Sequence, residues 1–169
     1  GICTETTTPA WFEDRADALG LIEIAERIAT ELDVVGILAV ELMQARDGRI
    51  VVNELAMRPH NTGHWTIDGA ATSQFENHLR AVADLPLGSP EQDSRWTVMV
   101  NILGGTRTDL LAGLGHVLAR DEYLRPQLYG KDVVPGRKVG HVTVLDDDLA
   151  AARRRAHAAA DYLRGLIDE

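Results

Sequence analysis

Apolar and polar positions alternate with two different periods along the chain, and each change of period marks a new element. Between residues 12 and 32, apolar side chains recur at spacings of three and four, which predicts an amphipathic helix. Residues 33–43 form a continuous apolar run, residues 45–49 contain the Asp-Gly pair of a tight turn, and residues 50–56 are apolar again. This order predicts an antiparallel β-hairpin.

The remaining elements follow from the same patterns. The opening stretch GICTETTTPA is rich in β-forming residues and stops at Pro9, so it is expected to be a strand cut off from something upstream. The acidic residues 146–148 favour the start of a final helix, through their interaction with the helix dipole. The elements expected after the hairpin are a helix within 72–88 closed by Pro86, a strand at 96–105, a helix at 108–119, strands at 123–130 and 137–145, and a last helix ending at Leu166.

Mixed helices and antiparallel strands without an internal repeat predict the α+β fold class. Proline, glycine and serine cluster at residues 85–94, which indicates a boundary between two parts of the chain. We therefore expect a hairpin-bearing domain at residues 1–88 and a small, β-rich domain at residues 95–169.

Composition narrows the class of protein. A chain of 169 residues with 45% hydrophobic residues can bury a real core, and a formal charge of -9 disfavours nucleic acid as a partner. The single cysteine, Cys3, cannot form an internal disulfide, which fits a reducing compartment. No apolar run approaches the roughly 20 residues of a membrane span, and the first ten residues lack the pattern of a signal peptide. These features predict a soluble, cytoplasmic protein that binds neither membranes nor nucleic acid.

Two acidic residues of the expected hairpin are candidates for metal binding. If the hairpin turns at residues 47–48, Glu41 pairs with Glu54 and both carboxylates point to one face. Facing like charges destabilise a strand pair unless a cation lies between them, and oxygen ligands suit Mg²⁺ or Mn²⁺. Alternatively, the hairpin faces solvent and its acids only aid solubility. The metal site is favoured because the other face looks covered, with Val40, Leu42, Val52 and Leu55.

The stretch after the second hairpin strand, NELAMRPHNTGHW, gathers an unusual set of polar groups. Arg58 could place its planar guanidinium against a small planar anion such as a carboxylate or bicarbonate. His60 and His64 are either acid/base groups, substrate hydrogen-bonders or ordinary loop histidines. Asn61 either holds the turn or touches a ligand.

The only two lysines of the chain, Lys131 and Lys138, lie seven residues apart in one loop. A tight turn at Pro135-Gly136 would bring Lys131 towards Arg137 and Lys138, and three cations around a turn could hold a monophosphate. The alternative is a solvated basic loop on an acidic protein. A glycine-rich phosphate loop of the common Lys-Ser/Thr type does not occur in the sequence.

These stretches resemble a known family. Residues 53–88 closely resemble the end of the ATP-grasp domain of 5-(carboxyamino)imidazole ribonucleotide synthetase, a ligase of purine biosynthesis, and LYGKDVVPGRKVGHVTVL is similar to its C-terminal domain. Other ATP-grasp carboxylases would share only the two glutamates and the following arginine. The PHNTGHW and PGRKVGH stretches together narrow the resemblance to this ligase.

The resemblance implies roles for the candidate residues. Glu41, Asn53 and Glu54 would bind ATP, the two glutamates through Mg²⁺. Arg58 and His60 would act on bicarbonate or the carboxyphosphate made from it. The substrates would be ATP, bicarbonate and aminoimidazole ribonucleotide, and the implied assembly is a homodimer. The residues implied to contact the bicarbonate and the ribotide are Arg58, His60, Asn61, His64, Lys131, Arg137 and Lys138.

One departure from the family concerns length. The family implies chains about twice as long, with an N-terminal α/β domain and an ATP-clamping subdomain before the part seen in this sequence. We therefore expect the polypeptide to be a fragment of the ligase that is inactive alone. Two alternatives are a non-catalytic nucleotide- or anion-binding module that keeps the fold, and another ATP-grasp ligase that joins a carboxylate to an amine.

Overall fold

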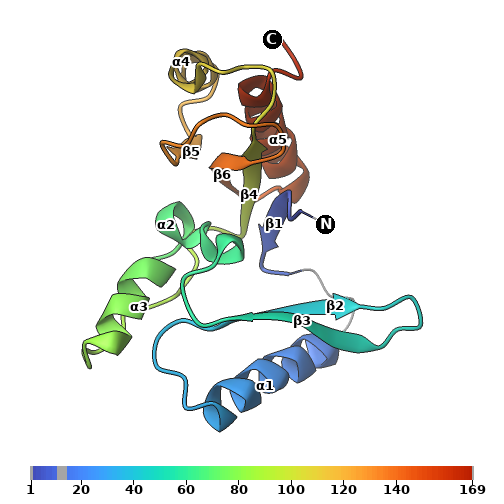
Figure 1. Cartoon of the computed structure of the whole chain (residues 1–169), viewed down its shortest axis with the longest axis vertical. Helices are drawn as coiled ribbons and strands as arrows, with labels where there is room; N and C mark the ends of the chain where they lie inside the picture. Colours follow the sequence, from blue (N-terminus) through green and yellow to red (C-terminus); the bar gives the residue numbers. More distant parts are fainter. Residues whose placement is uncertain (1, 11–14, 169) are drawn as a thin grey trace. The chain divides into compact units, whose positions relative to one another are not determined.

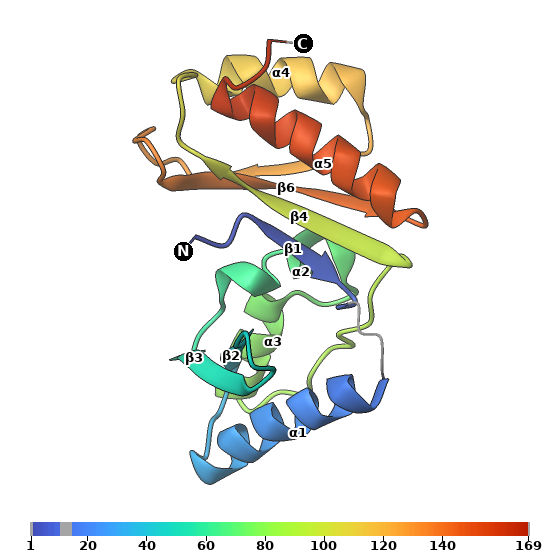
Figure 2. The same cartoon turned by 90° about the vertical axis from the view of Figure 1, so that its right-hand side faces the viewer.

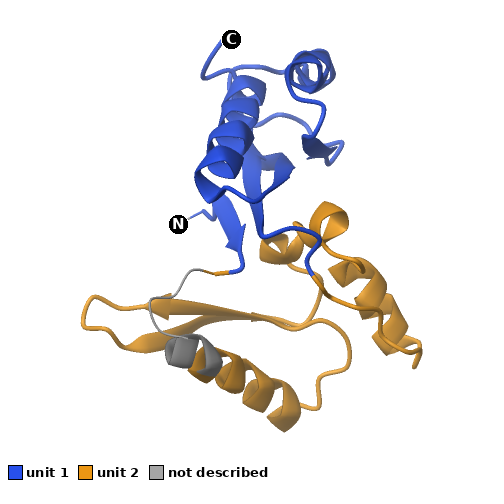
Figure 3. Cartoon of the chain, turned by 180° about the vertical axis from the view of Figure 1, so that it is seen from behind, with its two compact units in different colours: residues 1–9, 92–169 blue, residues 10–91 orange. Residues whose placement is uncertain are grey.

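The computed structural model describes residues 2–10 and 15–168, and these form two compact units (Figure 3). Unit 1 comprises residues 1–9 and 92–169, and unit 2 comprises residues 10–91. Helices and antiparallel sheets occur in both units, which confirms the expected α+β class. In the described part of the chain, no helix is both long enough and apolar enough to span a bilayer.

Unit 1 is a four-stranded antiparallel sheet with two helices on one of its faces (Figures 1 and 2). The strand order is β1-β4-β6-β5, so β4 and β6 are the inner strands. The element bounds are β1 (Glu5–Thr8), β4 (Trp96–Leu103), α4 (Leu110–Arg120), β5 (Arg125–Leu128), β6 (Lys138–Asp146) and α5 (Leu149–Arg164).

The core of unit 1 lies between the inner strands and α5. Alternate residues of β4 point towards the helices, and small residues of α5 at a spacing of four meet them. Because alanine side chains are short, α5 can lie close to the sheet. The alanine content of the last helix therefore has a packing function. Core residues include Val98, Val100, Ile102, Val142, Val144, Ala152, Ala156, Ala160 and Leu163.

Arg155 ties α5 to two other elements of unit 1. Its Nε donates to Asp121 Oδ2 at 2.6 Å, just after α4, and its Nη1 donates to Asp146 Oδ2 at 2.8 Å, at the end of β6. The hydrogen bond from Arg155 holds the pKa of Asp121 below its ordinary value of 3.8. The pKa of Asp146 is lowered first by the backbone N–H of Asp148, and Arg155 contributes as well. The arginine thus favours the charged form of both aspartates.

This network predicts a loss of stability in acid. Because both folded-state pKa values are depressed, the stabilisation is complete above pH 3.8 and disappears as the pH falls through the folded-state values. We expect Arg155→Met to lower the free energy of unfolding by about 2–3 kcal/mol at pH 7 and by much less near pH 2. Urea unfolding at both pH values measures this. Arg154→Met, one residue earlier on the exposed side of α5, is the matched control, and an equal loss in both variants would contradict the prediction.

The N-terminal strand β1 pairs within unit 1. β1 runs antiparallel to β4 from the pair Glu5 and Val100 to the pair Thr8 and Thr97. Gln92, at the start of the second segment of unit 1, donates from Nε2 to the Thr8 carbonyl at 3.1 Å. The compact units therefore differ from the expected domains in the placing of residues 1–9, while the division between residues 91 and 92 falls inside the predicted boundary at 85–94.

Unit 2 contains a two-stranded sheet, the 17-residue helix α1 and shorter helical segments (Figure 1). The strand expected at 33–43 starts only at residue 39, because Asp33 and Gly36 have positive φ angles of 48° and 110°, which interrupt an extended backbone. The 3-10 turn and the short helix after the hairpin were not expected from the sequence. The bounds are α1 (Arg15–Glu31), β2 (Ala39–Gln44), β3 (Ile50–Ala56), η1 (Asn61–Gly63), α2 (Thr66–Gly69) and α3 (Gln74–Val82).

Most large apolar side chains of unit 2 are exposed. Among its described residues, Ala56 is the only buried hydrophobic one. Val52 and Leu55 keep 48% and 42% of their surface exposed, so the expectation that the second face of the hairpin is covered is wrong for this chain. The helical repeat of Phe75, Leu79 and Val82 also faces solvent. The physical reason is that neither α1 nor α3 packs closely against the hairpin.

Candidate functional site

Glu41 and Glu54 lie directly opposite each other in the β2–β3 register, as expected. The hairpin reaches this register by a different route. Its turn closes between Ala45 and Arg49, where Ala45 N donates to Arg49 O at 2.8 Å. The turn is therefore centred on residue 47, whereas the predicted centre lies between residues 47 and 48. Near the turn, Leu42 then pairs with residue 52, and Asn53 is the extra residue of a β-bulge that restores the pairing of the glutamates.

The bulge gathers three oxygen-bearing side chains. Directly opposite residues of an antiparallel pair point to the same face, so the carboxylates of Glu41 and Glu54 share one face. Asn53 reaches the same group, because its Nδ2 donates to Glu41 Oε2 at 2.9 Å. Both glutamates keep part of their side chain exposed, at 30% and 50%, so a ligand can approach them.

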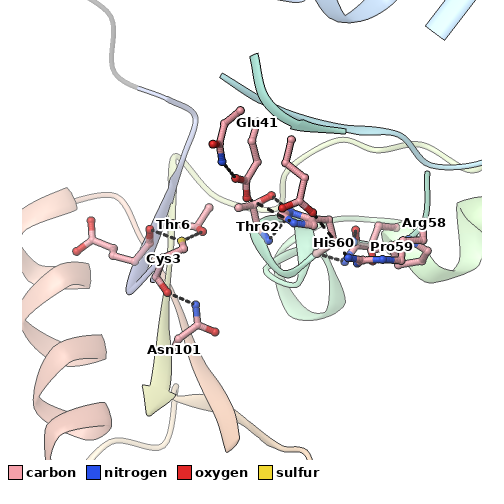
Figure 4. A network of polar contacts seen from close by, with 12 residues as sticks. Cys3, Thr6, Glu41, Arg58, Pro59, His60, Thr62 and Asn101 are labelled. Carbon is pink, nitrogen blue, oxygen red and sulfur yellow. Dashed lines mark hydrogen bonds and ion pairs between the residues drawn. The ribbon is translucent and has the colours of Figure 1, made fainter. Parts of the chain in front are cut away.

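His60 approaches Glu41 from the turn that follows β3 (Figure 4). Its Nε2 lies 3.5 Å from Glu41 Oε1. Its Nδ1 accepts a hydrogen bond from Thr62 N at 3.4 Å and also contacts Thr62 Oγ1 at 2.9 Å. Because Nδ1 accepts, Nε2 carries the proton of the neutral ring and presents it to the carboxylate. The buried imidazole is thus held in one orientation.

Arg58 completes the charged group on the hairpin side. Its Nη1 donates to the Pro59 carbonyl at 3.0 Å (Figure 4). Its Nη2 lies 4.0 Å from Glu54 Oε1. The guanidinium keeps 62% of its side-chain surface exposed. A cation that is tethered to the backbone yet accessible can bind a planar anion beside the carboxylates.

Gln74, a buried residue at the start of α3, fixes the turn that carries His60. Its Oε1 accepts from His60 N at 2.9 Å, and its Nε2 donates to His60 O at 2.8 Å. The same Nε2 contacts His64 Nδ1 at 2.9 Å. Gly63 makes room for this amide, since a Cβ at that position would lie 2.4 Å from Gln74 Oε1. Gln74 was not singled out from the sequence, because nothing local marks a glutamine as a clamp.

The two remaining polar residues of this turn have structural contacts. Asn61 begins η1, and its carbonyl accepts from His64 N at 3.1 Å. The ring of His64 also lies 5.4 Å from that of Phe75. Both residues help to shape the turn, and a role in ligand binding stays a prediction for each.

The acidic pair is suited to a metal ion that takes only two ligands from this chain and the others from water or substrate. Among residues 2–10 and 15–168, no group of three or more histidine, cysteine or acidic side chains is arranged to hold a metal. Two carboxylates with no sulfur nearby fit Mg²⁺, which usually retains waters and binds through one or two carboxylates plus substrate phosphates. Zinc-like sites, which need three or four protein ligands, do not fit this donor set.

The segment between β5 and β6 that contains Lys131 and Arg137 and ends at Lys138 is called the lysine loop. It lies at one end of the unit 1 sheet. Its base is closed by Tyr129 N donating to Val139 O at 2.9 Å. The tight turn expected at Pro135-Gly136 is confirmed, because Arg137 N donates to Val134 O at 3.0 Å and Gly136 has a φ of 76°.

Gly104, at the end of β4, holds this loop against the sheet. Its N–H donates to Arg137 O at 2.7 Å, and its carbonyl accepts from Gly136 N at 3.0 Å. A Cβ at position 104 would lie 2.2 Å from the Val134 carbonyl, so only glycine permits this approach. Lys131, Arg137 and Lys138 are therefore presented by a loop whose backbone is fixed at several points.

The structure thus brings the candidate residues together in two separate sets. Unit 2 gathers Glu41, Asn53, Glu54, Arg58 and His60 within one network of contacts around the hairpin bulge. Unit 1 carries the three cations of the lysine loop.

Comparison with known proteins bears on both sets. The family model of the ATP-grasp domain matches residues 1–75, and that of the phosphoribosylaminoimidazole carboxylase C-terminal domain matches residues 97–155. The N5-carboxyaminoimidazole ribonucleotide synthase of Mycobacterium tuberculosis H37Rv is 51% identical over 158 residues, which cover 92% of this chain and 36% of the relative. The chain belongs to this synthase family. It matches a C-terminal portion of the family's members.

Solved structures of the same family share the fold. An N5-carboxyaminoimidazole ribonucleotide synthetase described as an ADP complex has a TM-score of 0.82 at 37% identity, covering 99% of this chain and 43% of that one. The Aspergillus clavatus synthase in complex with ADP and 5-aminoimidazole ribonucleotide has a TM-score of 0.83 at 34% identity, covering 96% and 44%. The chain therefore spans less than half the length of these relatives. ATP-grasp ligases in general use ATP with a divalent metal.

Proposed function

We propose that this chain carries part of the active site of an N5-carboxyaminoimidazole ribonucleotide synthase. The reaction would consume ATP and bicarbonate to make carboxyphosphate and ADP, and the amine of 5-aminoimidazole ribonucleotide would then attack the carboxyl carbon. The observation that supports this most is the facing of Glu41 and Glu54 across the bulge, with Arg58 and His60 next to them. A module without catalysis has little need for two acidic side chains that face each other across a strand pair, an arrangement that costs stability.

In this proposal, unit 2 contributes to the phosphate end of bound ATP. Glu41 and Glu54 would hold Mg²⁺, and Mn²⁺ could replace it, while Asn53 orients Glu41 through its hydrogen bond. The metal supplies neutralisation of the charge on the transferred phosphoryl group. Arg58 would bind bicarbonate or the carboxyphosphate through its exposed guanidinium, and a cation already in place stabilises the transition state without reorganising.

His60 has the geometry of a proton donor or a hydrogen-bonding group beside that anion. Its Nε2 points to Glu41, and its orientation is fixed by Thr62 and Gln74. We propose that it keeps the Glu41 carboxylate aligned and can offer its proton to a bicarbonate oxygen. Asn61 and His64 would line the same turn and contact substrate from there.

In unit 1, Lys131, Arg137 and Lys138 would bind the 5′-phosphate of the ribotide. The turn at residues 134–137 and the contacts of Gly104 keep this loop in place before the ligand arrives, which lowers the entropic cost of binding. Three cationic groups are sufficient for a monophosphate dianion.

A hybrid enzyme tests the proposal. In the Mycobacterium tuberculosis synthase, the segment that aligns with this chain is replaced by the chain itself, which is 51% identical there. We expect the hybrid to consume aminoimidazole ribonucleotide in a reaction that needs both ATP and bicarbonate, and the isolated 169-residue chain to be inactive. The unmodified mycobacterial enzyme is the control. A folded hybrid that binds Mg²⁺-ATP but never consumes the ribotide would contradict the proposal.

We also propose a homodimer and a cytoplasmic location. The family resemblance supports the dimer, and the free Cys3, which forms no disulfide, fits a reducing compartment.

A further inference from the structure

A polar pair lies beneath the lysine loop, on the face of the unit 1 sheet that does not meet α4 and α5. His141 belongs to the inner strand β6 and is fully buried. Its Nδ1 shares a hydrogen bond of 2.8 Å with the hydroxyl of Tyr129, and the two rings are tilted by 54° with centroids 5.7 Å apart. The register explains the contact, since Gln127 pairs with His141 and Tyr129 follows two residues later on the same face.

The other end of this pair meets a cation of the loop. Lys131 Nζ lies 5.3 Å from the centroid of the Tyr129 ring, which is within the range of a cation–π contact. Gly130, between the two residues, has a φ of 64° and so turns the chain, allowing the lysine to lie over the ring two positions before it. A buried histidine, a half-buried tyrosine and an exposed lysine thus form a line from the sheet to the solvent.

An aromatic ring is a suitable support for a lysine that must bind an anion. A lysine side chain has four rotatable bonds, and without a contact its ammonium samples many positions. A carboxylate partner would fix it but would also neutralise it and compete with the phosphate. None of the ion pairs among the described residues includes Lys131. The ring face orients the ammonium and leaves its full charge for a ligand.

We propose that Tyr129, anchored by His141, is a positioning residue that keeps the ammonium of Lys131 in place for the phosphate of the ribotide. This inference rests on the proposed function, which assigns Lys131 to the phosphate. Tyr129 acts through Lys131 and His141 acts through Tyr129, so neither of them needs to touch the substrate. The same arrangement predicts that the hydroxyl of Tyr129 binds His141, while its ring contacts the ammonium of Lys131.

A double-mutant cycle on the 169-residue chain tests the inference, with ribose 5-phosphate as the probe and calorimetry as the readout. Loss of one cation–π contact corresponds to a loss of affinity of about fivefold, which we expect for Tyr129→Leu. In a background of Lys131→Ala, the same change should cost nothing further, because no ammonium is left to position. In a background of Arg137→Ala, it should cost the full factor. Tyr129→Phe, which keeps the ring, should lose less than Tyr129→Leu.

Two further measurements separate positioning from a structural role. Tyr123→Leu, which replaces an exposed tyrosine of the same unit, is the matched control and should leave affinity unchanged. In the unliganded wild type, nuclear magnetic resonance should show the ε-methylene protons of Lys131 shifted upfield by the ring, and this shift should disappear in Tyr129→Leu and persist in Tyr129→Phe. The resonance measurement on the wild type requires no variant to fold.

The outcomes are distinct. The inference would be overturned if Tyr129→Leu lowered the affinity equally with and without Lys131, or if the wild type showed no upfield shift. In either case the proposed phosphate site would still stand, provided that Lys131→Ala weakens binding of ribose 5-phosphate. A wild-type chain that shows the upfield shift but has no affinity for ribose 5-phosphate would overturn the proposed phosphate site, and the inference with it.

Discussion

Glu54→Gln in the hybrid synthase should reduce turnover at saturating ATP and bicarbonate by about a hundredfold to a thousandfold. Glutamine has nearly the same size and shape as glutamate, so the hairpin should keep its register. What changes is charge, since one of the two carboxylates that face each other across the bulge becomes a neutral amide. A divalent cation would then lose half of its negatively charged protein ligands, and the phosphoryl group would lose the neutralisation that the cation supplies.

The measurement is the initial rate of ribotide consumption across a range of Mg²⁺ concentrations. If Glu54 is a ligand, part of the lost rate should return as Mg²⁺ is raised, because weaker binding can be compensated by mass action. Glu91→Gln, at an exposed position of the same unit, is the control for removing one negative charge. A variant with wild-type rates and a wild-type Mg²⁺ requirement would exclude Glu54 as a metal ligand.

Lys138→Ala in the same hybrid is expected to raise the KM for aminoimidazole ribonucleotide about tenfold to a hundredfold, with little change in the KM for ATP. Hydrogen bonds to charged groups contribute about 1.5–3 kcal/mol, and this sets the size of the effect. Lys138 is half-buried at the start of β6, beside the loop that Gly104 fixes, so its position is defined by backbone pairing. A neutral side chain there removes one of three cations from the proposed phosphate site.

The selectivity of this effect is the informative part. Steady-state kinetics with each substrate varied in turn gives both KM values. Arg95→Ala removes one exposed positive charge from unit 1 outside the loop and should change neither of them. Equal increases in both KM values for Lys138→Ala would indicate a general disturbance of the enzyme and would count against a phosphate site in this loop.

The sequence predicted the hairpin well, because an Asp-Gly pair between two apolar runs is a strong local signal. The facing of Glu41 and Glu54 was also predicted, although two errors cancelled. The turn lies half a step earlier than assumed, and the bulge at Asn53 corrects the register before it reaches the glutamates. A bulge of this kind has no pattern in the sequence, since asparagine in a strand is equally consistent with an exposed regular position.

Contacts between distant residues could not be predicted in the same way. Gln74 clamps the turn at His60 from fourteen residues away, and Tyr129, which follows β5, reaches His141 in the neighbouring strand β6. Neither pairing alters the local period of apolar residues, so the sequence pattern does not reveal these contacts. The exposure of Val52 and Leu55 was missed for a related reason, because an apolar run indicates that a surface can be buried and does not say whether this chain buries it.

The pairing of β1 with β4 has a consequence for synthesis. During synthesis, β1 has no neighbour in the unit 1 sheet until residues 97–100 follow, after all of unit 2. Contacts between residues so far apart in sequence form slowly, because a long loop must close first. β1 therefore stays without its partner strand while unit 2 is synthesised, and binding by a chaperone in that interval would favour correct folding.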